Sequence, residues 1–185
     1  VTQATTFAMM DRLGIAQYLS RIGLLIDGNT GESLKAAKQS WMEDPVWQPL
    51  RKHCEDSFVV QDWFELFVAQ NLVTDGLLYP LAYGRSAGDL SQTGGAGAPL
   101  PTEFMDEWYA ESVKWVDAFV KTAAAESPEN KHLLSQWVRD GIASTTEALT
   151  PLAKLMYLED AQPALDEARA ALLARVAKTG LHVHT

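Results

Sequence analysis

Residues 61–83 are the stretch that most constrains what this chain can fold into. The stretch is too long for a strand, and its apolar residues recur at steps of three and four. They fall on nearly all sides of a helix, so other helices must cover most of its surface. Pro80 lacks a backbone donor and is expected to kink the last turns rather than end them at once. The sequence therefore predicts the central helix of a bundle.

Polar residues interrupt this apolar stretch at four positions. They are Glu65, Gln70, Asn71 and Asp75. A polar group in a mostly buried segment costs free energy unless it is hydrogen-bonded. We therefore expect each of the four to have a partner.

The rest of the chain repeats the helical pattern, and no segment reads as a strand. Helices are predicted over 5–26 and 31–43, from Asp44-Pro45 onward, over 102–126 after a Thr102 cap, over 128–148, and from Pro163 to Gly180. The first of these has two apolar stripes and is expected to be largely buried, and Asn29 or Thr30 is expected to cap the second. Pro151 should bend or end the fifth. Residues 84–101 are rich in glycine and predict a flexible loop. The fold class is all-α, with residues 1–185 as a single helical domain.

Composition excludes several classes of function. The chain has 185 residues, 47% of them hydrophobic, and a net charge of −9, which supports one folded core and argues against nucleic acid as a partner. No uninterrupted apolar run is long enough to cross a membrane. Cys54 is the lone cysteine, which excludes an internal disulfide and fits a reducing, cytoplasmic location. The first residues carry no basic n-region and no initiator Met, which suggests a trimmed chain.

A helical bundle with buried carboxylates raises the possibility of a di-iron site. Such sites take Glu-x-x-His pairs, because residues i and i+3 share a helix face. Glu129 and His132 alone have this spacing, and they fall in the first turn after Ser127-Pro128, where a solvated surface is expected.

The other candidate groups do not form a recognisable active site. His53 follows two basic residues on a solvated face, and it cannot act as a base for its neighbour Cys54 because adjacent helical residues point apart. His182 and His184 lie in the tail. No phosphate-binding or nucleophile-elbow motif is present. From its residues alone, the chain is interpreted as a helical interaction subunit without a catalytic site.

Several motifs resemble the β subunit of bacterial multicomponent monooxygenase hydroxylases, nearest to the phenol hydroxylases. They are Phe64–Leu72 with Asp75–Leu81, Gly14–Arg21, Asp44–Arg51, Glu107–Ser112 and Leu165–Arg169. The resemblance runs through almost the whole chain. It implies a ferritin-like (ribonucleotide-reductase-like) bundle, and the chain would be the C-terminal part of a longer β subunit.

The resemblance also implies a degenerate di-iron fold without metal ligands. Arg12 and Ile15 stand where a related α subunit has Glu and His, and Lys114 stands where it has His. Glu65 and Glu111 keep carboxylates at ligand positions. Protonated Arg12 and Lys114 could offset the charge of Glu65 and Glu111 but could not bind iron. We therefore expect polar pairs inside the bundle, and no catalytic, cofactor or metal site.

The family implies a function by assembly. The chain would be a non-catalytic structural β subunit of a soluble monooxygenase hydroxylase that oxidises phenol or a related hydrocarbon with O₂ and NADH. It would pack against a di-iron α subunit and a γ subunit, as (αβγ)₂, with an effector protein and a reductase that carries FAD and [2Fe-2S]. The substrate stays open, since related enzymes act on toluene, alkanes or alkenes.

Two other hypotheses remain. The chain could be a stand-alone helical scaffold or binding domain with no oxygenase role. It could also be a redox enzyme with its own carboxylate-bridged metal, against which the residue types at positions 12, 15 and 114 argue.

Overall fold

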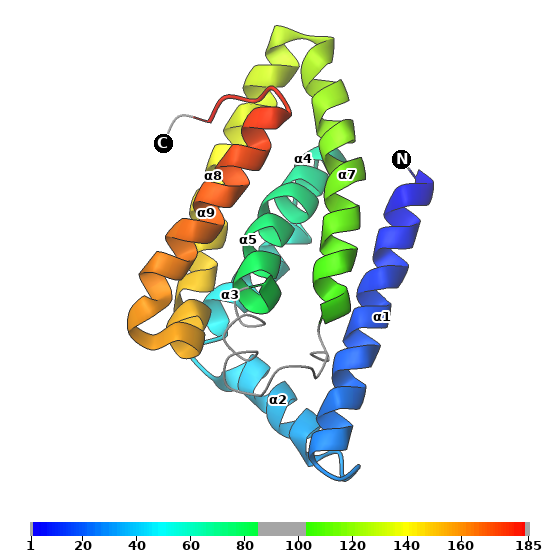
Figure 1. Cartoon of the computed structure of the whole chain (residues 1–185), viewed down its shortest axis with the longest axis vertical. Helices are drawn as coiled ribbons and strands as arrows, with labels where there is room; N and C mark the ends of the chain where they lie inside the picture. Colours follow the sequence, from blue (N-terminus) through cyan, green and yellow to red (C-terminus); the bar gives the residue numbers. More distant parts are fainter. Residues whose placement is uncertain (1, 85–102, 184–185) are drawn as a thin grey trace. The chain divides into compact units, whose positions relative to one another are not determined.

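The structure is a computed structural model that describes residues 2–84 and 103–183. It divides into two compact units, Val1–Gln48 and Pro49–Thr185, and each is described by itself. The prediction of one domain over 1–185 stays a prediction. All regular structure in the described residues is helical (Figure 1), as the periodicity predicts. None of these helices is both long enough and apolar enough to cross a membrane.

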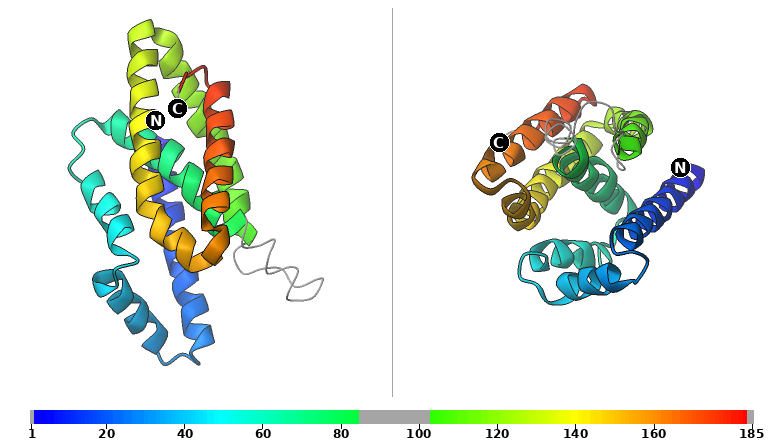
Figure 2. Two further views of the ribbon diagram at one scale, coloured as in Figure 1. Left: turned by 90° about the vertical axis from the view of Figure 1, so that its left-hand side faces the viewer. Right: turned by 60° about the horizontal axis from the view of Figure 1, so that its bottom comes forward.

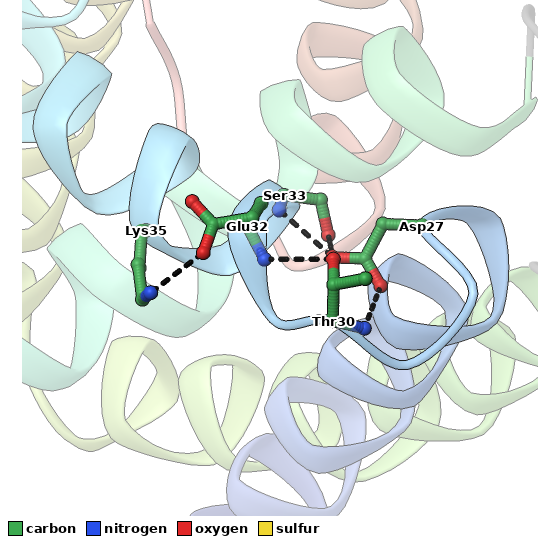
Figure 3. A network of polar contacts seen from close by, with 5 residues as sticks. All are labelled: Asp27, Thr30, Glu32, Ser33 and Lys35. Carbon is green, nitrogen blue, oxygen red and sulfur yellow. Dashed lines mark hydrogen bonds and ion pairs between the residues drawn. The ribbon is translucent and has the colours of Figure 1, made fainter.

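The first unit is a helical hairpin of α1 (Thr2–Ile26) and α2 (Glu32–Glu43). Its turn uses residues that tolerate a left-handed backbone, with φ of 68° at Gly28, 65° at Asn29 and 79° at Gly31. The carboxylate of Asp27 accepts hydrogen bonds from the backbone N–H groups of Thr30 at 3.1 Å and Ser33 at 2.9 Å (Figure 3). The bond from Ser33 is the main cause that holds the pKa of Asp27 below its ordinary value. Asp27 thus caps the start of α2. The Thr30 hydroxyl also accepts a hydrogen bond there, from the Glu32 N–H at 3.3 Å, so the capping predicted for Asn29 or Thr30 is confirmed for Thr30.

Helix α1 differs from the prediction of a largely buried helix. Its buried residues are Ala8 and Ile15, whereas Leu13, Leu25 and Ile26 are exposed. Within its own unit α1 packs against α2, which is half its length and has no buried residue. One short helix cannot cover an apolar surface that extends around α1.

The second unit is built around one composite helix. It comprises α4 (Trp63–Phe67), a π-helix η1 (Val68–Thr74), α5 (Asp75–Tyr79) and a second π-helix η2 (Pro80–Gly84). Asp62 caps it, since its carboxylate accepts hydrogen bonds from the N–H groups of Phe64 and Glu65. The helix continues through Pro80, as predicted. The wider π turns were not predicted, because periodicity over so few residues cannot separate them from α turns.

Three long helices surround the composite helix. They are α7 (Glu103–Glu126), α8 (Pro128–Tyr157) and α9 (Ala161–Lys178), with a short 3₁₀ turn, η3 (Leu158–Asp160), between the last two. Helix α8 packs on η1 and α9, while α7 contacts η1, η2 and α5 (Figure 2). Leu72, Val73 and Leu77 of the composite helix are almost fully buried. The prediction of a covered central helix is confirmed.

Two predicted helix boundaries are wrong. The predicted end of α8 near residue 148 is wrong, because the helix runs through Pro151 to Tyr157. Leu152 and Ala153 beyond the proline are buried, and the Tyr157 hydroxyl donates to the Leu81 carbonyl. These contacts outweigh the hydrogen bond that proline removes.

The third helix, α3 (Gln48–Ser57), begins later than Asp44-Pro45. Asp44 ends α2 instead, and its carboxylate accepts a hydrogen bond from the Val46 N–H at 3.1 Å. Thr102 and the predicted loop 84–101, apart from Gly84, lie outside the described residues.

Candidate functional site

The five positions predicted as former metal ligands are divided between the two units. Arg12 and Ile15 lie on α1 of the first unit, where Ile15 is 8% exposed and Arg12 is half-buried. Glu65, Glu111 and Lys114 belong to the second unit. The pairing of Arg12 with Glu65 therefore stays a prediction.

Glu111 and Lys114 form an ion pair, but on the surface. The Lys114 ammonium lies 2.8 Å from a Glu111 carboxylate oxygen, and the two side chains are 73% and 74% exposed. Val116 and Val120 occupy the buried face of α7, so this i, i+3 pair projects into solvent. The expectation of a Glu111–Lys114 pair inside the bundle is wrong.

Glu65 is half-buried and forms no hydrogen bond or ion pair through its carboxylate with any residue that the structure describes. It lies in the first turn of α4 and contributes to the wall of a cavity of about 300 Å³. Two more carboxylates, Asp56 and Asp140, also line this cavity, together with His53 and Trp137. The expected partner of Glu65 is therefore not found in the second unit.

His53 connects three elements at one side of the cavity. Its Nε2 atom lies 3.1 Å from the Thr74 hydroxyl of η1 and 3.4 Å from the Thr145 hydroxyl of α8. Burial lowers the pKa of His53 below its ordinary value, with Asp56 opposing the shift and Lys52 adding to it. His53 is thus part of a polar junction between helices, and not the solvated residue that its basic neighbours in the sequence suggest.

A further part-buried polar network of the second unit joins α7 and α9. Arg175 Nε donates to Asp117 at 2.7 Å, and Arg175 Nη1 donates to the Tyr109 hydroxyl at 3.1 Å. Burial is the main cause that raises the pKa of Asp117 and of Tyr109, and Arg175 opposes it in both cases. Sequence reasoning missed this network. A signal was present, because Arg175 follows Ala168 by seven residues and Leu172 by three, on the apolar stripe of α9.

Three of the four polar residues predicted to need partners have them within the composite helix. Gln70 Nε2 donates to Asp75 at 3.1 Å, and Asn71 Nδ2 donates to the Phe67 carbonyl at 3.2 Å. Asp75 is 4% exposed. For these three residues the expectation of a partner is confirmed.

The donor chemistry does not fit a di-iron centre. Arg12, Ile15 and Lys114 cannot supply iron ligands, and Glu111 is turned to solvent in an ion pair with Lys114. Within residues 2–84 and 103–183, no group of three or more His, Cys, Asp or Glu side chains is placed to hold a metal ion.

Comparison with known proteins identifies the lineage of this fold. Residues 1–127 match the methane/phenol/alkene hydroxylase family. The chain belongs to this family. It is 51% identical over 183 residues to the phenol 2-monooxygenase oxygenase component DmpL of Pseudomonas sp. strain CF600, covering 98% of this chain and 54% of that protein. It is 46% identical over 181 residues to the corresponding component MhpL of Acinetobacter pittii strain PHEA-2, again covering 98% and 54%.

A solved structure shows the same fold. The crystal structure of xenon-pressurised phenol hydroxylase from Pseudomonas sp. OX1 matches with a TM-score of 0.80 and 45% identity, over 95% of this chain and 52% of that one. The prediction of an all-α, ferritin-like helical fold is thereby confirmed. The chain spans about half the length of the curated phenol hydroxylase components that it matches.

Proposed function

We propose that this chain is part of the non-catalytic β subunit of a multicomponent monooxygenase hydroxylase that acts on phenol or a related hydrocarbon. The observation that carries the proposal is the similarity over 98% of the chain to two phenol 2-monooxygenase oxygenase components. A weaker similarity, 26% over 101 residues, or 55% of this chain and 31% of the relative, links it to the hydroxylase component subunit beta of the toluene-4-monooxygenase system of Ectopseudomonas mendocina.

The non-catalytic role is supported by the residues at the predicted ligand positions. A guanidinium at position 12, an alkyl group at position 15 and an ammonium at position 114 leave too few donors for two irons. In this proposal the di-iron centre belongs to an α subunit, and FAD and [2Fe-2S] belong to a reductase. NADH supplies the electrons, and a bacterial cytoplasmic location is part of the same proposal.

The scaffold role is supported by exposed apolar surface. Leu13, Leu25 and Ile26 of α1 are 60%, 73% and 79% exposed. Surface of this kind is typical of an interface with another subunit. In the proposed assembly α1 packs against the α subunit, and an (αβγ)₂ complex forms with an effector protein and the reductase as further partners.

Iron content and co-elution test the proposal together. The chain is produced alone and with the proposed large α subunit, and iron is measured in each size-exclusion peak. We expect iron in the peak that holds both chains and none above background in the chain alone. Stoichiometric iron in the chain alone would contradict the non-catalytic role. A folded, iron-free chain that elutes apart from the large subunit would instead favour the stand-alone scaffold.

A further inference from the structure

The cavity beside α4 has a volume that suits a small organic group. Its volume is about 300 Å³, at the lower end of the range for small-molecule sites. Val60, Leu66 and Ala69 supply apolar wall, and Trp137 of α8 adds an indole ring. This indole contacts no aromatic ring or cation among the described residues. The apolar wall can therefore receive an alkyl chain, and the ring can receive a flat or cationic group.

The charge of the cavity decides which class of ligand it accepts. Asp56, Glu65 and Asp140 line it, and none of the Lys or Arg residues in the described ranges does. Lys52 neutralises Asp56 from outside the cavity, at 2.5 Å. The carboxylates of Glu65 and Asp140 have no hydrogen-bond or ion-pair partner within the described parts of the chain. The cavity therefore repels anions and has two carboxylates available to a cation, the half-buried Glu65 and the exposed Asp140 at its rim.

The remaining polar groups are already engaged. Gln70 donates to Asp75, and His53 contacts Thr74 and Thr145. Because the carboxylates are not grouped closely enough to hold a metal ion within the described residues, a bare divalent cation does not fit. An organic cation can contact the separated carboxylates and the indole at the same time.

We propose that this cavity binds a guanidinium or primary ammonium group carried on an apolar stem. The stem lies along Val60, Leu66 and Ala69, and the cationic head lies between Glu65, Asp140 and the Trp137 ring. The same chemistry is presented by an arginine or lysine side chain of a partner protein and by a free polyamine. The inference does not depend on the role of the chain in an oxygenase.

Titration of the purified full chain with n-butylguanidinium tests the proposal, with neutral n-butylurea as the matched probe. Binding is measured by calorimetry and by the fluorescence change that is absent in Trp137→Phe. We expect saturable binding of the cation, at least tenfold tighter than that of the urea. Glu65→Gln and Asp140→Asn should each weaken it about fivefold, the effect of losing roughly 1 kcal/mol of ion pairing.

Glu147→Gln is the matched control, because Glu147 is an exposed carboxylate on α8 outside the cavity lining. It should bind as the unmodified chain does, and circular dichroism establishes that every variant is folded. Equal affinity for the urea, an equal loss in Glu147→Gln, or no saturable binding by the folded chain would overturn the proposal. Spermidine and the peptide acetyl-Leu-Arg-Leu-amide then distinguish a free polyamine from the side chain of a partner protein. The probe that belongs to the natural ligand class should bind more tightly.

Discussion

His53 has a structural role between helices that its neighbours in the sequence do not indicate. It follows Arg51 and Lys52, yet its ring reaches Thr74 and Thr145, of which Thr145 is fully buried. Thr145 is 92 positions further along the chain. The ring of His53 thus connects α3 to η1 and to α8.

The lowered pKa of His53 predicts a dependence of stability on pH. The unfolded chain, with a histidine pKa near 6.5, binds a proton more readily than the folded chain. Stability is therefore highest above about pH 6.5 and falls as the pH drops through that value toward the folded pKa. His53→Gln should reduce this slope in urea unfolding at pH 5.0–7.5.

His132→Gln is the matched variant for this measurement, since it removes an exposed histidine at the start of α8. It should retain more of the pH dependence than His53→Gln does. An unchanged slope in His53→Gln would show that other groups cause the pH dependence.

At the scale of elements, two ion pairs illustrate the difference between a contact within one helix and a contact between helices. Glu111 and Lys114 are three residues apart on one helix, so their pairing follows from helix geometry alone. Arg175 and Asp117 are 58 positions apart, and their contact joins α9 to α7. The side chain of Arg175 is 10% exposed and that of Asp117 is 25% exposed.

Removal of these pairs should have unequal effects on stability. Arg175→Met leaves a partly buried Asp117 carboxylate without its cation and should lower the free energy of unfolding by about 2–4 kcal/mol. Lys114→Met removes an exposed pair of the kind that contributes little and should cause no measurable change. Urea unfolding of both variants checks this. Equal effects would mean that the α7–α9 contact is not a stabilising one.

The elements also show which features of the fold can be predicted from sequence periodicity. Periodicity predicted the central helix and its burial by other helices, because a helix that is apolar on nearly all sides must be covered by them. It failed for the end of α8, because the buried Leu152 and Ala153 hold the helix together beyond Pro151. It failed for α1, since the same apolar pattern occurs whether a helix is covered by its own chain or by a partner.

At the scale of the whole molecule, the exposed side of α1 should determine assembly. Leu13→Glu places a charge on this apolar surface and should weaken co-elution with the large subunit at least tenfold, because an unpaired charge is costly at an interface. Its effect on the folded chain alone should be small, since Leu13 is 60% exposed. Analytical size exclusion of the mixed chains measures the loss.

Gln17→Glu provides the comparison for Leu13→Glu, because it adds the same charge at an exposed polar position on α1. It should leave assembly closer to that of the unmodified chain. Undiminished co-elution of Leu13→Glu would place the interface elsewhere, for example at the exposed Phe58 and Trp63.

The sequence alone determined the helical class, the central helix, and the residue types that cannot bind iron, because these follow from periodicity and side-chain chemistry. The tertiary structure decided which polar groups are buried together. Arg175 meets Asp117, His53 meets Thr145, and Glu65 lines a cavity with Asp140. These contacts join residues far apart in the chain. The helix faces that meet depend on how whole helices pack, which no local pattern specifies.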